Sequence, residues 1–496
     1  MYNRDKGAPQ KEALIFLEVR IMCGIAGFCR FNEDFALERE RWIKILVKMR
    51  EALSHRGSDQ VGEYLRSNIG LSHTRLSIRD LTGGVQPMIR YSGENEYVIV
   101  YNGEIYNTDE LIPDLSRRGY RFETTSDTEA ILYSYMAYGP DFAKKLNGIY
   151  ALAIWDSGEK RLVLCRDRLG VKPLFYTIKN GTLVFGSEQK ALFCYPEVFP
   201  EADEDSFREI FGIGPARSPG TGVFKGVREV LPGRLAIFSE NGFEEHSYWS
   251  LEARRHTDNY SETVDKVSFL LRDAVKRQMV SDVPVCTFLS GGVDSSVVTA
   301  IASDFLKKQG KTLNTFSFDF THNDEFFKAN SFQPTRDRPY VDKVLKEYPL
   351  RHTYLECDEA TLAELLPRAV ESKDLPGMTD VDTSLMFFCS EVKKHNKVAL
   401  TGECSDEIFG GYPWFYREEL FYADGFPWSF DISARVSLLS DEAIRRLELE
   451  DYVGARYEES RKETPVLPGE DCDERRRREV CYLNIRWFMQ TLLDRM

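Results

Sequence analysis

Short apolar runs bounded by turn residues dominate the first half of the chain, and such runs predict β-strands. We expect strands at 25–31, 69–78 and 97–101, and hairpins that pair 150–155 with 162–165 and 175–178 with 183–185. The second hairpin encloses Asn180-Gly181, which favours a tight two-residue turn. Amphipathic helices are expected at 35–53, 109–118 and 128–138. Helices beside mostly antiparallel strands indicate an α+β fold.

The pattern changes in the second half, where buried strands alternate with helices. Strands are expected at 283–289, 312–318, 352–355 and 397–400, and helices at 295–307, 340–348, 359–371 and 384–394. This alternation indicates a parallel α/β sheet. The polar, aperiodic segment 254–259 separates the two halves. We therefore expect one domain at 23–250 and a second at 251–496, after a leader at 1–22 that is not part of the mature protein.

Composition narrows the class of protein. The 496 residues include 65 Lys and Arg against 79 Asp and Glu, and the resulting net charge of −14 argues against a nucleic-acid-binding surface and favours small ligands. The ten cysteines include no C-x-x-C pair, and no Cys/His cluster is typical of zinc. There is no apolar run of bilayer length and no secretory signal at the start. We expect a cytoplasmic location.

The segment Leu289-Ser290-Gly291-Gly292-Val293-Asp294-Ser295-Ser296 follows a buried strand and begins a helix. Glycines let the backbone approach a phosphate, and the free N–H groups of a helix start bind anions. Asp294 could hold Mg²⁺ that bridges phosphates. The alternative is a Gly-rich turn without a ligand. No Lys follows the glycines, so this is not the common P-loop.

A second loop follows the strand at 397–400 and carries three carboxylates, Glu403, Asp406 and Glu407. Ligands of open α/β sheets lie at the carboxyl ends of the strands, so these acids suit a metal contact and an amino-acid ammonium group. Acids are also favoured at the start of any helix, which is the simpler interpretation of this loop taken alone.

Candidate chemistry in the first half begins at Cys23, which directly follows Met22. Removal of Met22 would give Cys23 a free α-amine able to act as the base for its own thiol. Asn102 and Gly103 offer an amide and a backbone N–H for an oxyanion hole. Arg75 could bind an α-carboxylate, and Asp127 an α-ammonium group, although Asp127 also suits a helix N-cap. Together these groups would recognise glutamine.

With these residues in place, the chain resembles the glutamine-dependent asparagine synthetases from Met22 to its end. Further motifs that carry the resemblance are Ser54-His55-Arg56-Gly57, Asn102–Asn107, Arg166–Leu174, Gly186-Ser187-Glu188, Ser281–Val285 and Ser405-Asp406-Glu407. The resemblance implies a class II glutamine amidotransferase domain of the N-terminal-nucleophile type, an αββα sandwich. It also implies a second domain of the ATP-pyrophosphatase type, similar to the adenine nucleotide α-hydrolases.

The resemblance also assigns roles. Cys23 attacks glutamine, Asn102 and Gly103 stabilise the oxyanion, and ammonia passes to an aspartyl-adenylate made from ATP with Mg²⁺. Glu403 is needed for the adenylation step, and Asp294 and Asp406 are the metal ligands. The implied glutamine-binding residues are Arg75, Leu76, Ser77, Ile78, Asn102, Gly103, Glu104 and Asp127. The implied ATP-binding residues are Leu289, Ser290, Gly291, Gly292, Asp294, Ser295, Ser296, Phe318, Thr401 and Gly402.

Both ends of the sequence depart from the family pattern. A leader retained before Cys23 would block its amine, and the codons of 17–20 are compatible with a bacterial ribosome-binding site upstream of Met22, so we expect translation to start at Met22 or the leader to be removed. At the other end, the segment 478–496 predicts a helix rich in apolar residues that stops without a cap. The family continues there with a segment that carries a catalytic Lys, so we expect the chain to be truncated at its C-terminus.

Two other functions stay open from the sequence. The acceptor could be another carboxylate, as in β-lactam synthetases, although those relatives usually lose the nucleophilic cysteine. Alternatively, the chain could be an inactive fragment in which Cys23 is blocked. Homodimers are common in the family, and the expected partners are glutamine, aspartate and ATP, with neither nucleic acid nor membrane.

Overall fold

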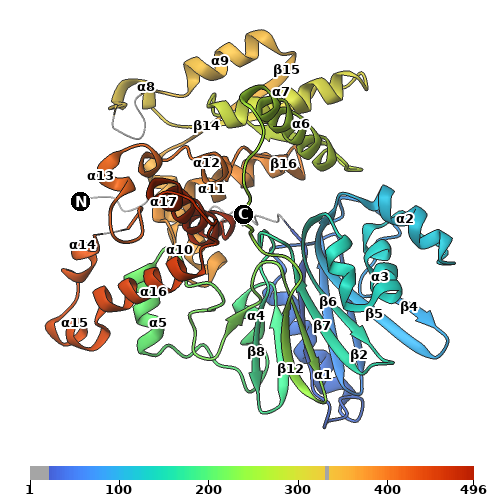
Figure 1. Cartoon of the computed structure of the whole chain (residues 1–496). Coiled ribbons are helices and arrows are strands. Elements are labelled where there is room, and N and C mark those ends of the chain that lie inside the picture. The colour runs from blue at the N-terminus through green and yellow to red at the C-terminus, as the bar shows by residue number, and fades with distance from the viewer. Residues whose placement is uncertain (1–21, 330–334, 430, 496) are drawn as a thin grey trace, which may run out of the picture.

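The computed structural model of the chain describes residues 22–329, 335–429 and 431–495. The predicted leader lies outside these residues except for Met22. The first half contains two six-stranded antiparallel sheets (Figure 1). The first consists of β1 (Gly24–Cys29), β2 (Gln60–Arg66), β3 (Ile69–Arg75), β8 (Phe175–Lys179), β9 (Thr182–Gly186) and β10 (Arg228–Glu229). The second consists of β4 (Met88–Ser92), β5 (Asn95–Ile105), β6 (Gly148–Asp156), β7 (Arg161–Arg166), β11 (Arg234–Ser239) and β12 (Gly242–Ser247).

The sheets pack face to face, and helices cover both outer faces. The strand orders are β10-β8-β9-β1-β3-β2 and β12-β11-β7-β6-β5-β4. The core between the sheets includes Ile25, Leu71 and Val100, all fully buried. The first sheet is covered by α1 (Arg39–Ala52) and α4 (Gln189–Leu192), and the second by α2 (Thr108–Arg117), α3 (Asp127–Tyr138) and η1 (Gly139–Lys145). This four-layer αββα sandwich confirms the predicted fold of the first half.

The turn between β8 and β9 shows why this hairpin could be predicted from the sequence. Asn180 and Gly181 both have positive φ angles, of 49° and 78°. A two-residue hairpin turn of the primed type requires this conformation at both positions, and Asn-Gly adopts it most readily. The strands on either side then pair in antiparallel register, with Lys179 opposite Thr182.

The second half is built on a parallel sheet with the order β15-β14-β13-β16. Its strands are β13 (Val285–Phe288), β14 (Leu313–Phe320), β15 (Leu350–Cys357) and β16 (Val398–Leu400). One face packs on α6 (Tyr260–Gln278) and α7 (Val293–Lys307), and the other on α11 (Thr379–Lys393), which lies beside α10 (Glu359–Lys373). Two further helices, α8 (Asn323–Phe326) and α9 (Arg338–Glu347), follow β14. The predicted α/β fold is confirmed.

Because β13 lies between β14 and β16, the strand order reverses at β13. The loops after β13 and β16 therefore leave the same edge of the sheet side by side, at the kind of switch point where α/β proteins bind ligands.

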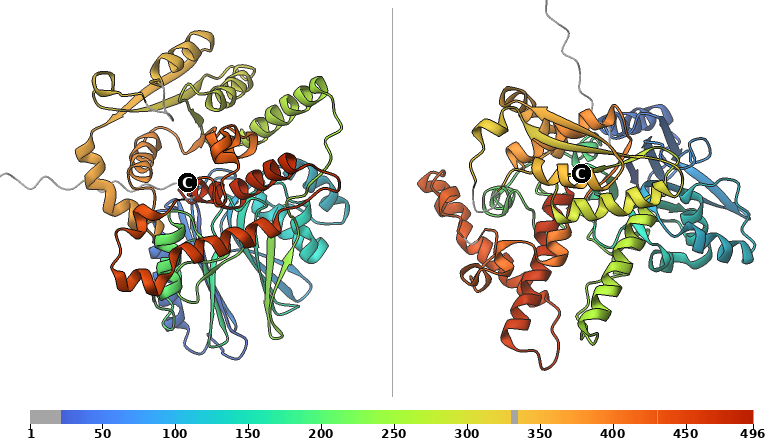
Figure 2. Two further views of the ribbon diagram at one scale, coloured as in Figure 1. Left: turned by 60° about the vertical axis from the view of Figure 1, so that its left-hand side comes forward. Right: turned by 90° about the horizontal axis from the view of Figure 1, so that it is seen from above.

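The remaining residues form a helical region that contacts both halves (Figure 2). It consists of α12 (Ser405–Phe409), η3 (Pro413–Phe415), α13 (Glu418–Phe421), α14 (Ser433–Val436), α15 (Asp441–Leu447), α16 (Leu449–Glu463), α17 (Cys472–Leu483), the π-helical η4 (Asn484–Phe488) and α18 (Met489–Leu493). The helix predicted at 478–496 thus begins six residues earlier and contains a π-helical turn. Its apolar side chains Val480, Leu483 and Trp487 are buried as expected. In Figures 1 and 2 the end of α18 lies between the two halves.

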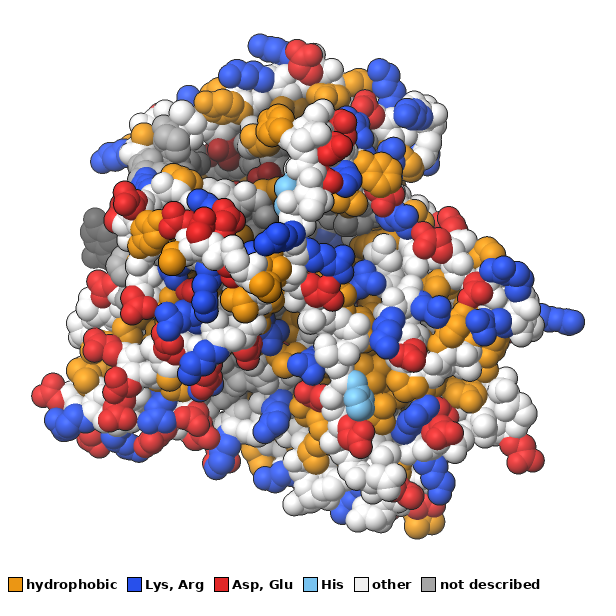
Figure 3. Space-filling view, viewed as in Figure 1, with side chains coloured by type: hydrophobic (Ala, Val, Ile, Leu, Met, Phe, Trp, Pro, Cys, Tyr) orange, Lys and Arg blue, Asp and Glu red, His pale blue; other side chains and the backbone are white. Residues whose placement is uncertain are grey.

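The first half reaches the helical region through α5 (Glu204–Arg208), η2 (Glu209–Ile213) and the loop that follows them. On the face shown in Figure 3, acidic and basic side chains are interspersed. No helix within the described residues is long and apolar enough to cross a membrane.

Candidate active sites

Cys23 immediately precedes β1 and lies next to the segment that follows β3. Its Sγ accepts a hydrogen bond from the Leu76 backbone N–H at 3.4 Å and lies 3.6 Å from the Leu76 carbonyl oxygen. Burial raises the pKa of the thiol to about 11. The thiol is therefore protonated at neutral pH, and within the described residues no imidazole or carboxylate is hydrogen-bonded to it.

The predicted glutamine-binding residues converge around this thiol. The charges of Glu104, Arg75 and Arg56 all act on the Cys23 pKa, which places them around one sulfur atom. Arg75 is buried, and its guanidinium donates to Gln60 Oε1 and to the carbonyls of Arg79 and Asp80, all neutral acceptors. Its positive charge is therefore not neutralised by an ion pair within the described residues, as expected for a group that binds a carboxylate.

The segment that supplies Leu76, Ser77 and Ile78 is also part of the contact between the two halves. Ser77 N–H donates to Asp59 Oδ2 at 2.8 Å, and the same oxygen pairs with Lys397 Nζ of the second half at 2.8 Å. Asp282 N–H donates to the Ile78 carbonyl at 3.1 Å, and Asp282 Oδ2 accepts from the Asp80 N–H at 2.8 Å. The second half therefore contacts this segment directly through Asp282 and indirectly, through Asp59, by Lys397.

Asp127 is not the N-cap of its helix, and that part of the prediction is wrong. The N-cap of α3 is Ser126, whose hydroxyl accepts from the Thr128 N–H. Asp127 is one residue inside the helix, and its carboxylate accepts from the Tyr101 hydroxyl at 2.9 Å and the Ile105 N–H at 3.0 Å. Burial raises the pKa of Asp127. The side chain therefore points into the site, toward β5.

Asn102 and Gly103 lie on β5 beside Glu104. Asn102 is buried, and its Nδ2 has no hydrogen-bond partner within the described residues. A buried amide donor without a partner is costly and suits a site whose acceptor comes from a ligand. At Gly103 a Cβ would lie 2.1 Å from the Ile149 carbonyl oxygen, so only glycine fits against β6. Glu104 is half-buried, its buried Oε2 has no partner among the described residues, and burial raises its pKa well above the ordinary value.

A buried charge cluster next to Cys23 was not assigned a role from the sequence. Arg56 Nε donates to the Cys23 carbonyl at 2.9 Å, and its Nη1 pairs with Glu188 Oε1 at 2.6 Å. Burial alone would raise the pKa of Glu188, but Arg56, His55 and Lys190 hold it well below its ordinary value. Both Arg56 and Glu188 stand in motifs noted above, and their near-complete burial marks them as a structural clamp on the nucleophile.

In the second half, the loop after β13 has the backbone expected of a phosphate cradle. Gly291 has a φ of +80°, and a Cβ there would lie 2.6 Å from Tyr340 Cβ. Helix α7 begins at Val293, and its N-cap, Gly292, provides no side-chain cap. The Ser290 and Ser295 hydroxyls lie 3.0 Å apart.

The loop after β16 packs directly on this cradle. A Cβ at Gly402 would lie 2.7 Å from the Ser295 nitrogen and 2.9 Å from Asp294 Cβ. The Phe318 ring, near the end of β14, packs among aromatic residues, with its centroid 5.7 Å from that of Phe388 in a tilted arrangement. Thr401 Oγ1 accepts from the Glu403 N–H at 3.3 Å. The structure thus brings the predicted ATP-binding loops to one edge of the sheet.

The predicted metal ligands Asp294 and Asp406 face each other closely enough for the Asp294 charge to raise the Asp406 pKa, in addition to burial. No group of three or more His, Cys, Asp or Glu side chains that could hold a metal is found in the described residues. Two neighbouring carboxylates beside a phosphate cradle fit Mg²⁺, which usually takes one or two carboxylates and completes its shell with phosphate oxygens and water.

Glu403 lies on the same loop and forms an ion pair with Arg495, just beyond α18. Burial raises the pKa of Glu403, and Arg495 partly offsets this effect. This contact brings the end of the described chain into the second site.

A cavity of about 180 Å³ lies where the two halves meet. Met22, His55 and Arg56 line it on the side of Cys23, whereas Cys389 and Arg495 line it near Glu403. Its other walls come from both halves, including the segments 170–175, 214–217 and 372–376. The cavity is therefore lined by neighbours of both predicted sites.

Comparison with known proteins agrees with this arrangement. Residues 22–249 match the glutamine amidotransferase domain, and residues 266–496 match the asparagine synthase family. The chain is 46% identical over 476 residues to asparagine synthetase [glutamine-hydrolyzing] 3 of Bacillus subtilis (strain 168), covering 96% of this chain and 76% of that protein. The chain belongs to the family of glutamine-hydrolysing asparagine synthetases.

Other relatives of this asparagine synthetase family member are more distant. Asparagine synthetase [glutamine-hydrolyzing] 1 of B. subtilis is 33% identical over 400 residues, which cover 80% of this chain and 60% of that protein. An amidase of Penicillium rubens is 32% identical over 415 residues, with the same two coverages of 80% and 60%. The chain thus spans between about 60% and 76% of the length of these relatives.

Proposed function

We propose that this member of the asparagine synthetase family transfers the amide nitrogen of glutamine to aspartate at the expense of ATP, through a β-aspartyl-AMP intermediate. AMP, pyrophosphate and glutamate are the other products. The observation that carries the proposal is the cavity lined by neighbours of both predicted sites, Met22 and Arg56 beside Cys23 and Arg495 beside Glu403. We also propose the division into an amidotransferase half at 23–250 and a synthetase half at 251–496.

In the amidotransferase half, the Cys23 sulfur attacks the side-chain amide carbon of glutamine. Asn102 Nδ2 and the Gly103 N–H stabilise the oxyanion, the thiol proton passes to the leaving nitrogen, and ammonia departs. Water then hydrolyses the thioester to glutamate. Arg75 and Asp127 bind the two charged ends of glutamine, with Leu76, Ser77, Ile78 and Glu104 completing the pocket.

The thiol needs a base, because its pKa of about 11 leaves little thiolate at neutral pH. The absence of a hydrogen-bonded side-chain base among the described residues supports the Cys23 α-amine in this role, after the Met22–Cys23 peptide bond has been cleaved. N-terminal sequencing of the active enzyme tests this step, and an active chain that retains Met22 would refute it.

In the synthetase half, the aspartate β-carboxylate attacks the α-phosphate of ATP and pyrophosphate leaves. Leu289, Phe318, Thr401 and Gly402 contact the nucleotide, and the segment 290–296 binds its phosphates. Asp294 and Asp406 would hold Mg²⁺, which would neutralise charge on those phosphates. Glu403 serves the adenylation step. Ammonia from the amidotransferase site then displaces AMP, and passage through the cavity would limit its contact with bulk water, where protonation would remove its nucleophilic lone pair.

Product stoichiometry tests the proposal. With glutamine, aspartate, ATP and Mg²⁺, the enzyme is expected to form asparagine, glutamate, AMP and pyrophosphate in equal amounts. Cys23→Ala should abolish glutamine-dependent synthesis and retain synthesis from ammonium chloride. Formation of ADP in place of AMP, or equal loss of both activities in Cys23→Ala, would contradict it.

A different carboxylate acceptor is the second candidate, favoured by the relative named as an amidase. It predicts AMP release with glutamine and ATP only when a carboxylate other than aspartate is supplied. Comparing aspartate with glutamate and with small carboxylic acids in the pyrophosphate assay separates the two candidates.

A further inference from the structure

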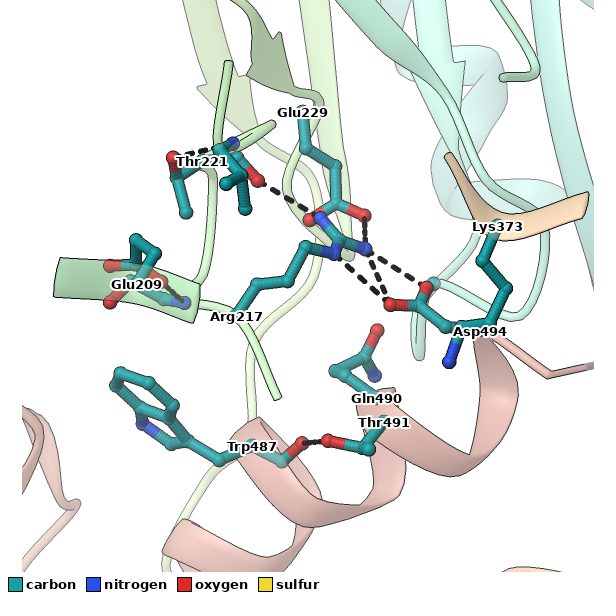
Figure 4. A network of polar contacts seen from close by, with 12 residues as sticks. Glu209, Arg217, Thr221, Glu229, Lys373, Trp487, Gln490, Thr491 and Asp494 are labelled. Carbon is teal, nitrogen blue, oxygen red and sulfur yellow. Dashed lines mark hydrogen bonds and ion pairs between the residues drawn. The ribbon is translucent and has the colours of Figure 1, made fainter. Parts of the chain in front are cut away.

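A row of four charged side chains, three of them buried and the fourth, Asp494, 19% exposed, crosses the interface between the two halves. Arg166, at the end of β7, pairs with Glu229 on β10, and Glu229 also accepts from Arg217 at 3.1 Å. Arg217 then reaches the second half, where it binds the Asp494 carboxylate through Nε at 3.1 Å and Nη2 at 2.8 Å (Figure 4). The side chains of Arg166, Glu229 and Arg217 are each less than a tenth exposed.

The charges balance only when both halves take part. Arg166 and Glu229 neutralise each other, so Arg217 carries an unmatched buried charge until Asp494 supplies the fourth member. Breaking a buried pair by removing one partner is strongly destabilising, because the remaining charge lacks both water and a counter-charge. The first half therefore has a site built for one particular carboxylate of the second half.

Asp494 is the C-cap of α18, and it joins that helix to Arg495. Its N–H donates to the Gln490 carbonyl at 2.9 Å, and the Arg495 N–H donates to the Leu492 carbonyl at 3.2 Å. A second anchor from the first half precedes it, because Gln490 Nε2 donates to the Leu169 carbonyl at 2.6 Å.

The residue next to Asp494 contacts the synthetase site. Arg495 pairs with Glu403, and its side chain is only 8% exposed. Asp494 and Arg495 are consecutive residues, so the bonds from Arg217 to Asp494 also constrain the backbone from which Arg495 reaches Glu403.

We infer that Arg217 of the amidotransferase half is a positioning residue for the synthetase site: by fixing Asp494 at the end of α18, it sets Arg495 against Glu403. This inference rests on the proposed function for the role of Glu403. It makes adenylation depend on a side chain that belongs to the other half and touches none of the substrates.

The test uses the full chain with ammonium chloride as the nitrogen source, so that glutamine chemistry is bypassed. In Arg217→Met the kcat for aspartate-dependent pyrophosphate release is expected to fall on the order of 10²-fold, as for other small misplacements of reacting groups, with KM for ATP unchanged. Glutamine hydrolysis should persist, which shows that the half carrying the substitution is folded. Arg217→Lys should recover part of the lost kcat.

Asp494→Asn provides the reciprocal change. It is expected to cause a similar loss, and the double variant Arg217→Met/Asp494→Asn should be no worse than either single variant, because both remove the same interaction. Arg446→Met is the matched control. Arg446 pairs with Glu204 across the same interface at 2.6 Å, but both side chains are far more exposed than Arg217, so this variant should leave pyrophosphate release unchanged.

Hydrogen exchange gives a readout that does not depend on activity. The amides of Leu492 and Leu493 should exchange faster in Arg217→Met than in the wild type, whereas those of Arg446→Met should not. The inference would be overturned if Arg217→Met and Asp494→Asn both released pyrophosphate at the wild-type rate and showed wild-type hydrogen-exchange rates. If the wild-type chain released no pyrophosphate with aspartate, the proposed function would be wrong, and hydrogen exchange alone would decide the positioning of α18.

Discussion

Lys172 carries a buried ammonium group beside the amidotransferase site, and replacing it with methionine is expected to stabilise the protein at neutral pH. Its Nζ lies 2.7 Å from Met22 Sδ, a weak acceptor, and forms no ion pair within the described residues. Burial, together with repulsion from Arg56, lowers the pKa of Lys172 from 10.5 to about 8. Folding therefore disfavours the charged form of this side chain.

The magnitude follows from the difference between the folded and unfolded pKa values. Each pKa unit corresponds to about 1.36 kcal/mol, so full burial would cost about 3 kcal/mol. The side chain as a whole is half-buried, and solvent screening reduces the expected effect to roughly 2 kcal/mol. Below about pH 8 the lysine is protonated in both states and the cost is fully present; as the pH rises to about 10.4 both states become neutral and the cost disappears.

Urea unfolding of wild type, Lys172→Met and the exposed-lysine control Lys179→Met, each at pH 7 and pH 10, measures this effect. Lys172→Met should have the higher free energy of unfolding at pH 7 and approach the wild type at pH 10, while the control follows the wild type throughout. A Lys172→Met protein that is less stable at pH 7, or whose advantage is the same at both pH values, would refute the reasoning.

Three other substitutions test separate parts of the structure. Asn102→Ala should lower kcat for glutamine hydrolysis by about 10²–10³-fold with little change in KM, because an oxyanion donor acts mainly in the transition state; steady-state kinetics in which only KM changes would contradict this role. Glu188→Gln removes the carboxylate that neutralises buried Arg56 and should cost about 3–5 kcal/mol of stability at pH 7. Because the folded-state pKa of Glu188 is depressed, this stability is present above about pH 4.3 and is lost on acidification. In urea unfolding, the free energies of unfolding of wild type and Glu188→Gln should therefore differ less at pH 3 than at pH 7. Equal free energies at pH 7 would count against the clamp. Cys404 has a left-handed backbone, with φ +68°, a conformation that costs a non-glycine residue about 1 kcal/mol. Cys404→Gly should therefore raise the Tm of the synthetase half in calorimetry. A lower Tm would show that the lost side-chain packing outweighs the strain.

Most of the fold could be predicted because its signals are local. The Asn180-Gly181 turn and the apolar runs of both sheets depend on neighbouring residues, and so does the glycine cradle at 290–292. The candidate site residues also came from local motifs, and the structure places Leu76 against Cys23 and Gly402 against Asp294.

What could not be predicted depends on contacts between distant segments. The carboxylate of Asp127 looked like a helix cap, because nothing in its own segment shows that Tyr101 would donate to it. Likewise, Arg217 and Asp494 are 277 positions apart in the sequence, and neither stands in a motif. From sequence alone, a charged residue is expected to be exposed to solvent. A buried ion pair between distant segments is therefore recognised only in the folded structure.

The bonds between Asp282 and the segment around Ile78 limit how these two halves can be recombined. The same few backbone groups contribute to the predicted glutamine pocket and hold the entry to β13, the strand that leads into the phosphate cradle. A chimera that attached this synthetase half to an unrelated amidotransferase would need a working nucleophile. It would also need a segment equivalent to 76–80 that binds Asp282, which we call the docking strip. Grafting experiments that transplant the segment 76–80 together with its domain should therefore succeed more often than those that exchange the domain and redesign the strip.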